Sequence, residues 1–73
     1  MRETVGRVLW RAAEDEDFRR RALYNLGAAL AEEGFILSDM EMSLLREQWE
    51  VLCGLPERDS YARVMALARS YRR

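Results

Sequence analysis

Apolar residues recur along most of this chain at the three- and four-residue spacing that is typical of amphipathic helices. Residues 2–13 contain one such stripe, made by Val5, Val8, Leu9, Ala12 and Ala13. Residues near the end of the chain contain another stripe, made by Tyr61, Val64, Met65, Ala68 and Tyr71. These stripes predict a first and a last helix, each with one face turned to a core, and they favour an all-α protein.

Short-range signals indicate where the central helices begin and end. Asp15 is placed to cap a second helix, and Asn25 is placed to cap a short third helix. Gly34 follows the third helix, where a residue with positive φ is needed to end it. Ser38 and Glu41 have the spacing of a capping box, in which each side chain accepts a hydrogen bond from the backbone amide of the other residue.

The fourth predicted helix, from about Asp39 to Cys53, has a wider apolar surface than a lone amphipathic helix needs. One stripe consists of Met42, Leu45, Trp49 and Leu52, and a second consists of Met40, Leu44 and Val51. We expect this helix either to be the central helix of the fold or to present part of its surface to another protein. Gly54 ends it, and the fifth helix begins at Pro56 or a few residues later.

The length of the chain bounds what it can build. Seventy-three residues form one small domain, which we take as residues 1–73 and expect to be a compact orthogonal bundle of about five short helices. Its core is small, and a single cysteine cannot form an internal disulfide. We therefore expect stability to come from efficient helix packing or from a partner surface.

Two local features carry expectations about packing. Arg19, Arg20 and Arg21 are adjacent and splay around one turn, so we expect them to point outward and to pair with the acids before them. Gly27 lies within the third helix, where glycine costs about 1 kcal/mol relative to alanine, so we expect a kink or a close contact there.

Charge is distributed unevenly along the chain. Residues 37–59 contain two arginines and six acids, whereas residues 60–73 contain four arginines and no acid. This asymmetry predicts that the fifth helix packs beside the fourth with complementary charge. The alternative interpretation is a basic tail that is free to bind RNA or DNA.

Residues 28–49 also have the outline of a helix-turn-helix. A helix that reads DNA presents Arg, Asn, Gln or Lys near its N-terminus. Here the early positions carry Asp39, Glu41 and Ser43. The two carboxylates would repel phosphate, and the net charge of −1 points the same way. A nucleic-acid-binding module is therefore the weakest of the interpretations.

The residues that catalysis and metal binding usually need are missing from the sequence. The chain has no histidine, so it cannot assemble a His–Cys or Ser–His pair to activate a nucleophile. It shows neither a glycine-rich phosphate loop nor zinc-ligand spacing. Cys53 is expected to be a small core residue. We expect no enzyme activity, no cofactor and no metal.

The sequence favours a cytoplasmic protein. No apolar run approaches the roughly 20 residues that cross a bilayer. The N-terminus lacks the apolar core and the small-residue cleavage site of a signal peptide, and the one cysteine has no partner in the chain.

One pattern of residues resembles a known small helical domain. It comprises Asp15, Phe18-Arg19, Leu23, Ala28-Ala29-Leu30, Gly34-Phe35, Leu37-Ser38, Glu41 and Leu45. The pattern resembles the LigA-like small subunit of extradiol ring-cleaving dioxygenases and the related stand-alone proteins of the nitrile-hydratase-like leader peptide (NHLP) clan. The match covers residues 5–52, and its motif is mostly helix punctuation.

The resemblance implies an all-α fold of about five short helices and a non-catalytic recognition role. The dioxygenase small subunit packs on a metal-bearing catalytic chain, and the leader peptides are gripped by modifying enzymes. The chain departs from the family at Asn25-Leu26, where Asp-Pro is usual, which softens the break between helices. A leader peptide is usually followed by a core peptide, the segment that the enzymes modify. After Gly54 this chain has an arginine-rich helical segment without cysteine, so we do not expect it to be a precursor that carries its own core peptide.

We therefore expect a domain that binds a larger protein, such as a catalytic subunit or a modifying enzyme. The candidate contact residues are large and lie at the edges of stripes: Tyr24, Leu26, Met42 and Trp49. For each of them the alternative is a place in the core. The main alternative function is a homodimer that buries the wide face of the fourth helix in a symmetric interface.

Overall fold

Five α-helices and no strand make up residues 2–71, the part of the chain that this computed structural model describes. The helices are α1 (Arg2–Glu14), α2 (Glu16–Tyr24), α3 (Leu26–Glu33), α4 (Asp39–Cys53) and α5 (Glu57–Ser70). The predicted all-α class with five short helices is confirmed. Within the described residues, no helix is both long and apolar enough to cross a membrane.

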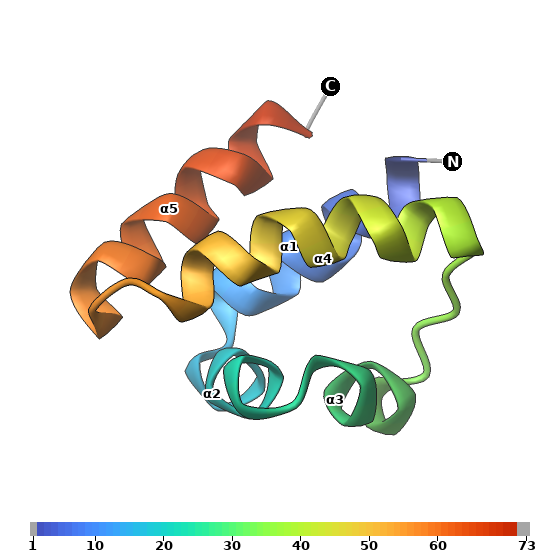
Figure 1. Cartoon of the computed structure of the whole chain (residues 1–73), viewed down its shortest axis with the longest axis horizontal. Helices are drawn as coiled ribbons and strands as arrows, with labels where there is room; N and C mark the ends of the chain where they lie inside the picture. Colours follow the sequence, from blue (N-terminus) through green and yellow to red (C-terminus); the bar gives the residue numbers. More distant parts are fainter. Residues whose placement is uncertain (1, 72–73) are drawn as a thin grey trace.

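The central helix is α1, which packs most extensively against α5 and also contacts α2 and α4 (Figure 1). Its stripe is fully buried, with no exposed surface left on Val5, Val8, Leu9 and Ala12. The helix α4 covers α1 with one of its two predicted stripes, which buries Leu45, Trp49 and Leu52. The second stripe stays partly in solvent, because Met40 is 65% exposed and Val51 is 46% exposed.

The predicted helix boundaries are confirmed by their hydrogen bonds. The side chains of Asp15 and Asn25 each accept from the backbone amide three residues later, at 3.1 Å. Gly34 adopts a φ of 78°, in the left-handed region that ends a helix. In the capping box, the Glu41 amide donates to Ser38 Oγ at 3.2 Å, and the Ser38 amide donates to Glu41 Oε1 at 2.9 Å. The fifth helix begins at Glu57, directly after Pro56.

The expectation that Arg19 points outward is wrong. Its side chain is 8% exposed, and its Nη1 donates to the backbone carbonyl of Ala12 at 2.7 Å. Its guanidinium also lies 4.8 Å from the ring centre of Tyr61. Arg19 therefore satisfies a carbonyl in the last turn of α1, where the helix itself supplies no donor, and it joins α1, α2 and α5.

Two expectations about small residues are also wrong. Gly27 makes no close contact: a Cβ built there meets only Asn25 Oδ1 within 4 Å, at 3.8 Å. It lies in the first turn of α3, and the break in the chain direction comes before it, at Asn25. Cys53 is exposed and not part of the core, because it lies on α4 beside the buried stripe and not within it.

The close approach of two elements occurs instead at Gly6. A Cβ built on this residue of α1 would lie 3.1 Å from the Cβ of Tyr71. Separations of this size are tighter than ordinary van der Waals contact, so glycine allows the end of α5 to pack directly on α1.

Ion pairs join the first three helices. Glu33, at the end of α3, binds both Arg11 of α1 at 2.6 Å and Arg21 of α2 at 3.2 Å. Arg21 also binds Glu32 at 2.6 Å. Both guanidinium groups lie within 6 Å of the Phe18 ring centre, at 5.7 and 5.9 Å. Helix α5 does pack beside α4, as predicted. Among the described residues, however, no ion pair connects α4 acids with α5 arginines, so the expected complementary charge does not take the form of ion pairs.

Candidate protein-binding groove

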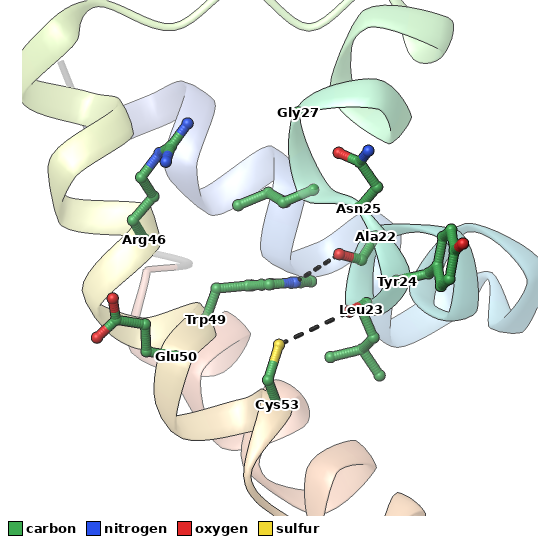
Figure 2. Close-up of a pocket in the computed structure, with 10 residues that line it drawn as sticks. Ala22, Leu23, Tyr24, Asn25, Gly27, Arg46, Trp49, Glu50 and Cys53 are labelled. Carbon is green, nitrogen blue, oxygen red and sulfur yellow. Dashed lines mark hydrogen bonds between the residues drawn. The ribbon is translucent and has the colours of Figure 1, made fainter.

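A groove of about 570 Å³ lies between the corner where α2 meets α3 and one side of α4 (Figure 2). The corner contributes residues 22–27, and α4 contributes Arg46, Trp49, Glu50 and Cys53. These α4 positions follow the three- and four-residue spacing of one helix face. The groove is therefore built from two rigid helical elements.

Asn25 creates the corner. It is both the C-terminal cap of α2 and the N-terminal cap of α3, with an extended backbone at φ −154° and ψ 95°. Its amide donates to the Arg21 carbonyl at 2.8 Å, while its side chain accepts from the Ala28 amide at 3.1 Å. Because one residue ends one helix and starts the next, the chain turns without a loop.

Trp49 connects the two walls. Its Nε1 donates to the carbonyl of Ala22 at 2.9 Å, and one turn further along α4 the Sγ of Cys53 lies 3.7 Å from the carbonyl of Leu23 (Figure 2). Both carbonyls belong to the last turn of α2, where a helix leaves its acceptors without internal donors. Side chains of α4 therefore bind the carbonyl groups at the C-terminal end of α2 and fix the two walls of the groove relative to each other.

The α4 rim of the groove carries charge. Arg46 and Glu50 are exposed and one turn apart, and within the described residues neither takes part in an ion pair. Figure 2 shows Arg46 on α4 above Trp49, whose indole points across to Ala22. Polar and apolar side chains thus share the groove lining, with Leu23 and Leu26 on one wall and Arg46 and Glu50 on the other.

The structure brings three of the four candidate contact residues together. Leu26 and Trp49 line the groove, and Tyr24 lies at its outer rim with the ring turned away from α4 (Figure 2). Tyr24 is 93% exposed, whereas Trp49 is only 4% exposed. Met42 is half-buried against the core and lies outside the groove lining.

Sequence reasoning missed the remaining α4 residues of the groove. The sequence does show that all three of them, Arg46, Glu50 and Cys53, share one helix face, because they are three or four residues apart. That face could not be assigned to a groove without knowing which neighbour lies opposite it, and the neighbour is about 25 residues earlier in the chain.

The groups with shifted pKa values lie outside the groove lining. The hydrogen bond from the Phe18 amide holds the pKa of Asp15 below its ordinary 3.8, and the Arg11 guanidinium acts in the same direction. Hydrogen bonds to Glu32 and Glu33 raise the pKa of Arg21. Both shifts follow from helix capping and ion pairing, so they indicate structural roles.

Further hollows occur on the surface. One of about 720 Å³ lies against α1 and includes Phe35 and Tyr71, and one of about 280 Å³ adjoins the groove through Leu23 and Cys53. Within the described residues, no group of three or more cysteine and acidic side chains is arranged to hold a metal ion. Compared with known proteins, the chain matches no family model, no curated protein and no solved structure.

Proposed function

We propose that this domain is a non-catalytic recognition module that binds a larger enzyme over the corner between α2 and α3. The observation that carries the proposal is the preformed groove, with Trp49 at its base and a fully presented tyrosine at its rim. Tyrosine, tryptophan and arginine are the residues that most often dominate binding energy at protein interfaces. Here Tyr24 and Arg46 are exposed at one site, and Trp49, which is 4% exposed, supports its base.

The groove also suggests the form of the partner surface. An apolar side chain of the enzyme enters over Trp49 beside Leu26, and polar groups of the enzyme bind the charged rim at Arg46 and Glu50. Tyr24 points to the outer side of the corner, so the enzyme must also wrap around it to cover the ring. The walls need no reordering on binding, which lowers the entropic cost of association.

The resemblance to dioxygenase small subunits and to leader peptides supports an enzyme as the partner. Both kinds of relative act by being held by a catalytic chain. The absence of histidine from the sequence supports the non-catalytic part of the proposal.

Binding can be tested by site-specific crosslinking followed by a measured affinity. A photoreactive amino acid at position 24 is expected to capture the enzyme in cells, whereas the same group at Ile36, a large residue that is 87% exposed outside the groove, is not. The captured enzyme is then purified and titrated into a Trp10→Phe variant, in which Trp49 is the single tryptophan reporter.

The decisive comparison is between two alanine variants of matched exposure. Tyr24→Ala is expected to weaken enzyme binding by about tenfold or more, the effect of losing an interfacial aromatic residue. Ile36→Ala is expected to leave the affinity unchanged. Equal effects of the two variants, or a Trp49 emission that does not respond to the enzyme, would contradict the proposed groove.

A further inference from the structure

We propose that a second surface, the α4–α5 face, is a two-fold interface between two copies of this chain. The face consists of Met40, Leu44 and Val51 of α4 and Leu67 of α5, flanked by Glu47 and Arg63. It is separate from the groove, whose α4 residues Arg46, Glu50 and Cys53 lie on another side of the helix. The enzyme site and the dimer site are therefore independent.

The α4 edge of this face is an exposed stripe. Met40, Leu44, Glu47 and Val51 recur at three- and four-residue spacing, so they share one side of the helix. Met40 and Val51 keep much of their surface in solvent, and Leu44 is half-buried. This stripe is the part of the α4 apolar surface that exceeds what a lone amphipathic helix needs.

The α5 edge is located by a hydrogen bond. Ser60 Oγ donates to the Leu52 carbonyl of α4 at 3.2 Å, so the first turn of α5 contacts α4 on this side. Arg63 and Leu67 follow Ser60 by three and seven residues and continue the same side. Leu67 is half-buried and Arg63 is exposed. The two helices lie next to each other beyond their connecting turn and then diverge (Figure 1).

The charges on this face are unpaired and segregated. On this face the α4 edge carries the acid Glu47, and the α5 edge carries the base Arg63. Within the described residues, neither Glu47 nor Arg63 forms an ion pair. By contrast, Arg11, Arg20 and Arg21 of the first two helices all bind carboxylates.

A face that is acidic on one edge and basic on the other is complementary to its own copy. A two-fold axis that runs along the apolar strip places α4 of one copy over α5 of the other. Each Glu47 then faces Arg63 of the other copy, and the apolar side chains meet between them. The net charge of −1 adds little general repulsion between copies.

The size of the face sets the expected affinity. A standard interface buries about 800 Å² on each partner, which is about a sixth of this chain's 5020 Å² of accessible surface. Helix α4 has 15 residues and is therefore about 22 Å long. One edge of this helix and one edge of α5 together bury less than about 800 Å². We therefore expect a reversible dimer that dissociates in the micromolar range.

Charge reversal tests this arrangement. Glu47→Arg alone and Arg63→Glu alone each place like charges opposite each other twice in the dimer, so each is expected to raise the dimer dissociation constant by about tenfold or more. Mixing the two variants restores both opposite-charge contacts in a heterodimer. We therefore expect the mixture to regain the dimer mass in sedimentation velocity, at a concentration at which each variant alone is mostly monomeric.

The mixing result separates contacts between copies from contacts within one copy. If Glu47 and Arg63 acted only within a chain, the double variant would recover but the mixture would not, and the proposal would be overturned. A wild-type chain that stays monomeric up to millimolar concentration would overturn it as well. Both positions are exposed, and far-ultraviolet circular dichroism checks that each variant keeps its helices.

Tyr24→Ala serves as the control that keeps the two sites apart. It is expected to leave the dimer unchanged, and a loss of dimer in this variant would assign self-association to the groove. The charge-reversed monomers are in turn expected to bind the enzyme as well as the wild type does. Failure of the dimer and failure of enzyme binding are thus observed in different variants.

Discussion

The bond between Trp49 and the end of α2 should be a principal source of stability, and Trp49→Phe tests it. The indole Nε1 donates to the Ala22 carbonyl at 2.9 Å, and both residues are buried. Phenylalanine retains most of the apolar ring but cannot donate. The substitution therefore leaves a buried carbonyl without a partner, in the last turn of a helix that supplies no other donor.

The expected cost follows from two contributions. Leaving a buried acceptor unsatisfied costs about 1–3 kcal/mol, and the smaller ring forfeits about 1 kcal/mol of buried apolar surface. The sum is about 2–4 kcal/mol. A domain of 73 residues has a total free energy of unfolding of about 4–11 kcal/mol, so this one change should remove about a third of it.

Urea denaturation followed by circular dichroism measures the effect. The matched control is Trp10→Phe, the same substitution at the chain's other tryptophan, which is half-buried and lies outside the groove. We expect the urea midpoint to fall more for Trp49→Phe than for Trp10→Phe, because the Trp49 ring is buried and the Trp10 ring only half-buried, with similar m-values. If the free energy of unfolding of Trp49→Phe lies within about 0.5 kcal/mol of the wild-type value, the hydrogen bond to α2 is not a major contribution to stability and the reasoning is refuted.

Three further predictions concern single residues. Arg19→Met should lower the free energy of unfolding by about 1–3 kcal/mol, because it leaves the α1 carbonyl unsatisfied, while Arg20→Met at a surface ion pair should change it by less than about 1 kcal/mol in the same urea assay. Gly34→Ala should destabilise the fold by about 1–2 kcal/mol because alanine is strained at positive φ, whereas Gly27→Ala, where a Cβ has space, should stabilise it by up to about 1 kcal/mol. Thermal melting measures both variants. An equal shift of the melting temperature in both would contradict the positive-φ role of Gly34. The folded state lowers the pKa of Asp15, so the Asp15 carboxylate stabilises the fold above the ordinary pKa of 3.8, and this contribution is lost as the pH falls below that value. Asp15→Asn can still cap the helix but cannot titrate. It should therefore weaken the fall of melting temperature with pH in the acid range.

The helix boundaries were predictable because their causes are local. Asp15, Asn25 and Ser38 bond to amides three residues away, and Gly34 needs only its own backbone freedom. A sequence displays such relationships directly. The predicted class and number of helices follow from these boundaries together with the apolar spacing.

The errors arose where the partner is distant in sequence. Arg19 reaches a carbonyl seven residues earlier in another helix, so helical spacing alone marked it as outward. The charge asymmetry between the last two helices was also misleading. Exposed charges contribute little compared with apolar burial, and α5 packs chiefly on α1, which offers it the larger apolar surface.

The candidate site was predictable in part for the same reason. Tyr24 and Leu26 flank a break that the sequence shows, so their position at a corner could be inferred. The bond of Trp49 to a carbonyl 27 residues earlier could not, and it converts a predicted contact residue into one that also supports the groove.

The shared cap at Asn25 has a consequence for how this domain opens. With no connecting loop, α2 cannot lose its last turn without removing the first turn of α3. At the far end of α3, Glu33 is bound to both α1 and α2. The two short helices should therefore unfold as one cooperative unit, and their amide protons should exchange with solvent at a common free energy.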